Sequence, residues 1–166
     1  MLPEFNASGA VFSPCRQYRY LLWRRWDERE PLVFICLNPS TADEQHNDPT
    51  NRRTMGFARD LGFGGMVMAN LYAYRATQPA DLFKAQDPVG PDNDQWLAEL
   101  ANQGLTMIAG WGNHGHRPER LAQLKDLPLQ ALKINGSGAP AHPLYLKKGL
   151  RPSPYTIAQG NDSPIR

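Results

Sequence analysis

The feature that most constrains the fold is an apolar run at residues 32–36, followed directly by the polar segment Leu37-Asn38-Pro39-Ser40-Thr41-Ala42-Asp43. A segment that is apolar at every position predicts a strand buried on both faces. Pro39 has no N–H for a sheet hydrogen bond, so the strand must end there. The polar residues beyond it then lie at the carboxyl end of a buried strand, where ligands bind in open α/β sheets. The sequence therefore predicts a binding site before it indicates a reaction.

Similar patterns along the chain predict alternating strands and helices. Proline, glycine and capping residues favour helices that begin at Asp48, Asp92 and Pro118, and a short one over residues 78–85. We expect an edge strand at 18–26 and buried strands at 32–37, 66–71, 105–109 and 129–134. This alternation predicts an α/β fold, a three-layer α/β/α domain with a mostly parallel central sheet of about four strands.

Length and composition indicate one ordinary globular domain. The 166 residues are 41% hydrophobic and 20% charged, with a net charge of +2, which permits a nucleic-acid partner without requiring one. We expect a core over residues 15–150 and a flexible tail over 151–166. Two cysteines, and neither a signal peptide nor an apolar segment long enough to span a bilayer, favour a cytoplasmic protein with no membrane association.

Polar and aromatic residues recur where the predicted strands end. Right-handed crossovers bring the ends of successive parallel strands to one edge of the sheet, so these groups can converge. Amides, imidazoles and an aromatic wall together suit a planar polar ligand such as a nucleobase. The candidates are Asn38, Pro39, Ser40, Asn70, Trp111, Gly112, His114, His142 and Leu144.

Each candidate also has a purely structural interpretation. Asn38-Pro39 could initiate a turn, Asn70 could bond to neighbouring backbone, and Trp111 could be a core aromatic. His114 could cap the helix that follows it. Asp43, His46 and Asp48 could bind a metal, although their spacing fits a solvated loop better. Arg52 and Arg53 could form a solvated helix face or contact phosphates.

Five blocks of the sequence resemble a bacterial and phage family known only as a domain of unknown function, DUF1643. The resemblance covers about residues 15–150, nearly the whole domain, and implies no activity. The blocks are L-N-P-S-T-A-D, D-P-T-N-R-R, A-N-L-Y-A-Y-R-A-T, W-G-N-H-G and H-P-L-Y-L.

The same blocks are more remotely similar to the uracil-DNA glycosylase superfamily. That resemblance implies that Asn38 positions water, that Asn70 reads the base edge, and that His142 stabilises the negative charge on the leaving base. It also implies that Leu144 or Tyr145 replaces the flipped nucleotide. Lys147 and Lys148 follow that loop and suit phosphate contact.

Two departures from that superfamily bear on the chemistry. Asn38 is not a carboxylate, so it cannot act as a general base, and only His46 can stand in for the base-stacking ring expected at residues 41–47. The leading hypothesis is a cofactor-free, monomeric enzyme that binds, and can hydrolyse, a nucleobase N-glycosidic bond in DNA or a nucleoside-like substrate. The alternatives are a non-catalytic nucleic-acid or nucleotide-binding module and, third, a metal-dependent enzyme that uses Asp43, Asp48 and a histidine.

Overall fold

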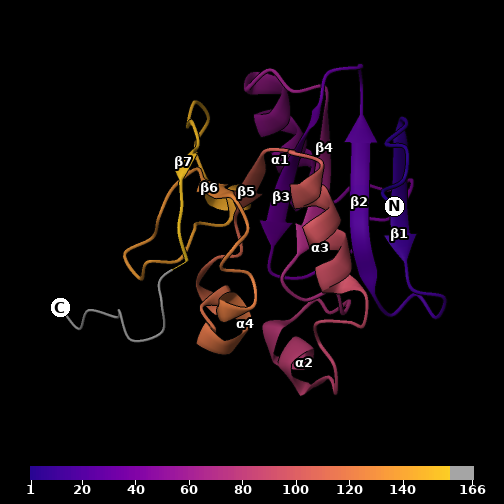
Figure 1. Ribbon diagram of the computed structural model, residues 1–166, viewed down its shortest axis with the longest axis vertical. Helices are drawn as coiled ribbons and strands as arrows, with labels where there is room; N and C mark the ends of the chain where they lie inside the picture. Colours follow the sequence, from indigo (N-terminus) through magenta and orange to yellow (C-terminus); the bar gives the residue numbers. More distant parts are fainter. Residues whose placement is uncertain (158–166) are drawn as a thin grey trace.

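The computed structural model describes residues 1–157, which form a mixed α/β fold around a single sheet (Figure 1). The strands are β1 (Ser8–Phe12), β2 (Arg19–Arg25), β3 (Pro31–Cys36), β4 (Gly65–Asn70), β5 (Met107–Ala109), β6 (Leu129–Ala131) and β7 (Ser153–Pro154). The helices are α1 (Pro49–Asp60), α2 (Pro79–Lys84), α3 (Asn93–Asn102) and α4 (Pro118–Ala122), with short 3₁₀ helices η1 (Asn113–Gly115) and η2 (Pro143–Tyr145).

The seven strands lie in the order β1-β2-β4-β3-β5-β6-β7. The four central strands, β4-β3-β5-β6, are parallel, and they are the buried strands predicted from apolar runs. The prediction of an α/β fold is therefore confirmed. The sheet itself is mixed rather than mostly parallel, because β1, β2 and β7 add antiparallel pairs at its two sides.

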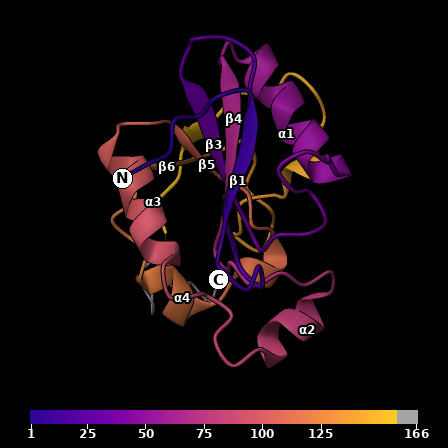
Figure 2. The ribbon, with the colours of Figure 1, turned by 90° about the vertical axis from the view of Figure 1, so that its right-hand side faces the viewer.

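Side chains from the central strands alternate between two hydrophobic clusters, one on each face of the sheet. On one face Phe34 and Met68 pack with Phe57 of α1. On the other, Ile35 packs with Leu100 of α3 and Leu121 of α4. Figure 2 shows this arrangement, with α1 on one side of the sheet and α3 and α4 on the other.

Helix α1 begins and ends as its sequence predicts. Asp48 is the N-cap, and its carboxylate accepts a hydrogen bond from the backbone N–H of Asn51 while Pro49 occupies the first turn. The chain turns at Gly62, where φ is +88°. At the start of α3, Asp92 and Gln95 have the sequence pattern of a capping box, but this prediction is wrong, because the side chain of the N-cap, Asp92, makes no capping hydrogen bond.

The sheet is wider than predicted on both sides. Strand β2 was expected at the edge, but β1 covers it through antiparallel pairing. Within the predicted tail, β7 pairs with β6 and Ile157 is buried, whereas residues 158–166 lie outside the described residues. No helix in residues 1–157 is both long and apolar enough to cross a membrane.

Candidate functional site

A cavity of about 650 Å³ opens at the carboxyl ends of the central strands. Its walls come from the segment after β3, the segment after β5, and residues 141–146 around η2. This size lies within the usual range of about 300–1,000 Å³ for small-ligand pockets. The predicted convergence of strand ends therefore produces a real concave site.

Eight of the predicted ligand-contacting or catalytic residues line this cavity, and the others do not. Those that line it are Asn38, Ser40, Trp111, Gly112, His114, His142, Leu144 and Tyr145. Those outside its lining are Pro39, His46, Asn70, Arg52, Arg53, Lys147 and Lys148.

Two glycines after β5 allow the loop around His142 to approach. A Cβ atom at Gly110 would lie 2.9 Å from Cδ of Pro143, which is too close for a side chain. Gly112 has φ +73°, which favours glycine, and its N–H donates to the carbonyl of Pro140 at 2.9 Å. The two loops that carry His142 and Trp111 are thus held against each other.

The orientation of His142 is fixed by its own backbone neighbourhood. Nδ1 accepts a hydrogen bond from the N–H of Leu144 at 3.2 Å. A nitrogen that accepts cannot carry a proton, so the proton of the neutral ring is on Nε2. Burial lowers the pKa of His142, and the negative charge of Asp48 opposes this only in part. His142 therefore presents a neutral Nε2–H donor.

The amide of Asn38 is oriented by the chain on either side of it. Nδ2 donates to the carbonyl of Ala76 at 2.6 Å and to that of Pro39 at 3.1 Å. Its Oδ1 accepts no hydrogen bond within residues 1–157, so the oxygen is the atom free to accept one. The amide can position a hydroxyl or water, but it cannot take a proton from it.

The structural interpretation given for Trp111 agrees with the structure, whereas the one given for His114 does not. Trp111 belongs to the hydrophobic cluster beside α3 and α4 and packs edge-on against Tyr155 at a centroid distance of 5.9 Å. It is a core aromatic that also forms part of the cavity wall. His114 lies on η1 and does not cap α4, whose N-cap is Arg117.

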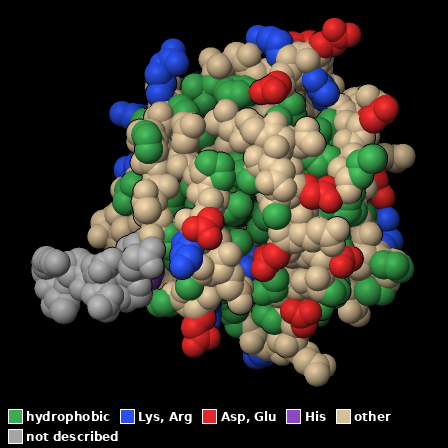
Figure 3. Space-filling view, in the orientation of Figure 1, with side chains coloured by type: hydrophobic (Ala, Val, Ile, Leu, Met, Phe, Trp, Pro, Cys, Tyr) green, Lys and Arg blue, Asp and Glu red, His purple; other side chains and the backbone are tan. Residues whose placement is uncertain are grey.

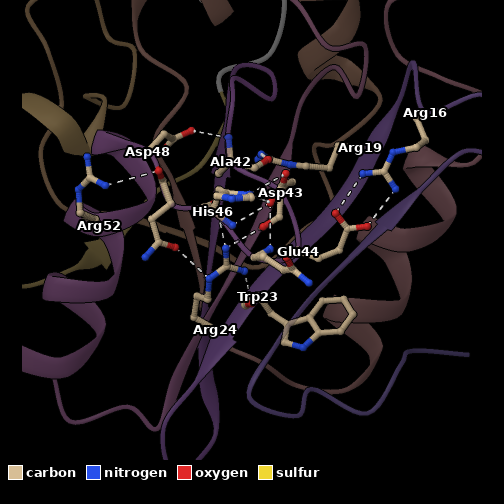
Figure 4. Close-up of polar contacts among 12 residues, drawn as sticks. Arg16, Arg19, Trp23, Arg24, Ala42, Asp43, Glu44, His46, Asp48 and Arg52 are labelled. Atoms are coloured by element: carbon tan, nitrogen blue, oxygen red, sulfur yellow. Dashed lines mark hydrogen bonds and ion pairs between the residues drawn. The ribbon is translucent and has the colours of Figure 1, made fainter.

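The loop at residues 42–48 is held by internal hydrogen bonds (Figure 4). The N–H groups of Gln45 and His46 donate to the Asp43 carboxylate and lower its pKa to about 2. The exposed His46 ring lies beside Asp43 at 3.0 Å. Within residues 1–157 no three histidine, cysteine or acidic side chains gather as a metal site, so the grouping of Asp43, Asp48 and a histidine is not formed.

Asn70 ends β4 but does not line the cavity. It follows Met68 on the face of β4 that packs against α1, and it is fully buried. On the packed helix α1, Thr54 donates to the sulfur of Met68, and Asn51 lies about one helical turn before Thr54. The side-chain amides of both asparagines lack hydrogen-bond partners within residues 1–157.

The predicted phosphate-contacting residues lie around the junction of α1 and η2. Arg53 stacks over Phe57 and donates to the carbonyl of Leu146, so it links the two elements. Arg52, Lys147 and Lys148 are exposed. Tyr145, beside the two lysines, is 83% exposed.

Sequence reasoning missed three charged residues of the cavity lining. Arg19 and Lys133 were not considered as site residues, and Asp48 was considered only as a helix start and a metal ligand. Asp48 is the only acidic side chain in the lining drawn from the described residues. Its carboxylate oxygens accept from the N–H groups of Ala42 and Asn51, at 3.1 and 2.7 Å. Arg19 begins a strand rich in arginine and aromatic residues, a composition that gave no signal for burial.

The family described as "Protein of unknown function (DUF1643)" matches residues 19–144, which include all four central strands and every cavity-lining residue except Tyr145 and Leu146. The chain belongs to this family. A search of curated proteins and a search of solved structures each returned no match. The DUF1643 match covers β2, which carries Arg19, as well as the Asn38 and His142 segments.

Proposed function

We propose that the cavity binds a nucleobase and hydrolyses its N-glycosidic bond, with His142 and Asn38 at the reacting atoms. The observation that carries this proposal is the hydrogen bond from Leu144 N–H to His142 Nδ1, which leaves Nε2–H as the donor in a cavity shared with Asn38. A fold of the glycosylase type is part of the same proposal, and it is supported by the order of the segments at the strand ends.

The chemistry requires a donor for negative charge on the leaving base. As the glycosidic bond breaks, its electrons move onto the base, and a positioned N–H lowers the energy of that anion. A neutral imidazole suits this task because burial disfavours its charged form. His142 would hydrogen-bond to the base while the sugar becomes electron-poor.

Water must then add to the sugar. Asn38 Oδ1 can accept a hydrogen bond from that water and hold it in place, without removing its proton. As the C–O bond to the sugar forms, the proton that the water loses passes to the departed base anion, which leaves as the neutral base. Both oxygens of the Asp48 carboxylate already accept backbone N–H bonds. Rate enhancement would therefore rest on positioning and on stabilisation of the leaving base, and we expect slow turnover.

Recognition of the base can come from more than one amide. Asn70 is fully buried outside the cavity lining, so it would contact a base only if the residues that cover it moved. Asn113 lies in the cavity wall, and its Oδ1 accepts from Asn135 and Ser137, so its Nδ2 is the free donor.

A polynucleotide substrate would approach from the side of α1 and η2. Exposed Arg52, Lys147 and Lys148 provide positive charge there, and exposed Tyr145 is a better candidate than the half-buried Leu144 for insertion between bases. The face of α3 and α4, seen in Figure 3, carries interspersed acidic and basic side chains without a continuous basic patch.

A binding module without catalysis is the second candidate. Two observations favour it. Position 38 holds an amide rather than a carboxylate that could act as a general base. The Asp48 carboxylate, the only acidic side chain in the described lining, already accepts two backbone N–H bonds. In both candidates the ligand occupies the same cavity.

Cleavage and binding of labelled oligonucleotides that contain uracil, hypoxanthine or other altered bases test the proposal. We expect abasic product from at least one substrate, loss of product with Asn38→Ala or His142→Ala, and retention with His46→Ala, a matched control outside the cavity. Binding without product by the wild type would select the binding module. Absence of both would contradict the two candidates.

A further inference from the structure

Among residues 1–157, three arginine side chains are almost completely buried, and one differs from the other two. Arg120 is 4% exposed and pairs with the Asp94 carboxylate at 2.6 Å, while its Nε donates to the carbonyl of Leu71. Arg24 is 7% exposed and donates four hydrogen bonds, to Trp23, Asp43, His46 and Asn47. Each of these guanidinium groups is thus well satisfied.

Arg19 is the most deeply buried of the three, at 2% exposed, and has the fewest partners. Its single side-chain hydrogen bond runs from Nη1 to the carbonyl of Ala42 at 2.8 Å. Nε is buried without a partner, and no carboxylate lies within ion-pair distance in the described part of the chain. A buried charge without an ion partner is costly, and proteins normally pair it.

Arg19 is also the only one of the three that lines the cavity. Burial lowers its pKa to about 10, so the guanidinium stays charged at neutral pH. Asp48 favours the charge from a distance, but its carboxylate oxygens already accept two backbone N–H bonds. Nη2 also donates no hydrogen bond within residues 1–157, and unlike Nε it is not fully enclosed by protein atoms. Nη2 is therefore the guanidinium nitrogen that can donate to an oxygen of a phosphate or carboxylate in the cavity.

We propose that Arg19 binds an anionic oxygen group of the ligand, so that the cavity takes a nucleotide or an acidic base rather than an uncharged nucleoside. This inference rests on the proposed function for the identity of the ligand as a nucleobase derivative, but it does not require hydrolysis. Lys133 adds a second positive charge to the lining, and Asp48 is the only negative one drawn from the described residues.

Calorimetric binding to the intact protein tests the proposal with four probes: inorganic phosphate, uridine, uridine 5′-monophosphate and a pyrimidine carboxylate. The monophosphate and the carboxylate separate the two sources of the anion. We expect the wild type to bind one of them at least about 30-fold more tightly than uridine, the discrimination expected for a buried charge pair. Arg19→Gln should remove the preference, and Arg19→Lys should keep part of it.

Lys133→Gln is the matched control, because it removes an exposed cation from the same cavity and should reduce the preference much less. Equal binding of charged and uncharged probes by the wild type would overturn the proposal, as would an unchanged preference in Arg19→Gln. If Arg19→Gln does not fold, the melting temperature of the wild type with each anionic probe tests the proposal instead. An anion that binds only the folded state must raise that melting temperature above the value in a chloride control of equal ionic strength. No rise would then count against the proposal.

The anion site at Arg19 and the hydrolysis of the N-glycosidic bond can fail separately. Cleavage of altered bases that does not depend on Arg19 would leave hydrolysis standing and remove the anion site. Anion binding that depends on Arg19, without cleavage of any substrate, would do the reverse.

Discussion

The backbone N–H of Leu144 donates a hydrogen bond to Nδ1 of His142 across 3.2 Å. The two residues are separated only by Pro143, which fixes the start of η2. The bond therefore sets the tautomer of the imidazole without help from another side chain. It makes His142 a donor at Nε2 for as long as the ring stays neutral.

The stability of the protein should depend on pH through the buried imidazole of His142. Burial lowers the pKa of His142 below its usual value near 6.5, so the folded protein binds this proton less readily than the unfolded chain. The free energy of unfolding that comes from His142 should be fully present above the unfolded pKa. It should be lost as the pH falls toward the lowered pKa of the folded state. Melting temperatures of the wild type and His142→Gln between pH 5 and 8 check this.

We expect the melting temperature of the wild type to fall more steeply on the acidic side than that of the variant. His46→Gln is a suitable comparison, because that exposed ring should leave the steep fall in place. Parallel curves for the wild type and His142→Gln would contradict the assigned environment of His142.

The second prediction concerns the cap of α1. Asp48→Ala removes the acceptor for two backbone N–H groups, so unfolding should become easier by about 1–3 kcal/mol. Asp92→Ala is the matched control at α3, because the Asp92 side chain makes no capping hydrogen bond, and it should change stability by less than about 0.5 kcal/mol. Urea unfolding of both variants measures the difference, and equal effects would refute the capping role.

The third prediction concerns the contact between the two loops of the cavity. Gly110→Ala would force the new Cβ against Pro143 and should destabilise the protein by about 1–3 kcal/mol. Gly136→Ala meets nothing within 4 Å and has no unusual φ, so its effect should be small. Thermal unfolding of the two variants tests this. A stable Gly110→Ala variant would mean that the loops are not held together in this way.

Much of the fold follows from apolar runs and helix signals in the sequence. The four central strands are predictable because they are apolar at nearly every position, and the start of α1 because Asp48 precedes Pro49. Strand β1 is half-buried and contains Gly9, and β7 has only two residues, one of them proline. Neither has a pattern that distinguishes it from a loop, so these two outermost strands could not be predicted, whereas β2 was.

The site was predictable where residues follow central strands directly. Asn38 and Trp111 come after β3 and β5, and both line the cavity. Arg19 was not predictable, because its burial depends on β1 and the loop at residues 42–48 covering β2. Asn70 was correctly placed at the end of β4, and it shares a face of the sheet with Met68, but it is fully buried and does not line the cavity.

The single-turnover rate of base excision by His142→Ala tests the central claim most directly, measured on the oligonucleotide that the wild type cleaves fastest. Removal of one positioned donor to a developing anion typically costs about 10²–10³ in rate. We expect a loss of that size with little change in binding, and a rate for His46→Ala equal to that of the wild type. A wild-type rate in His142→Ala would contradict the account.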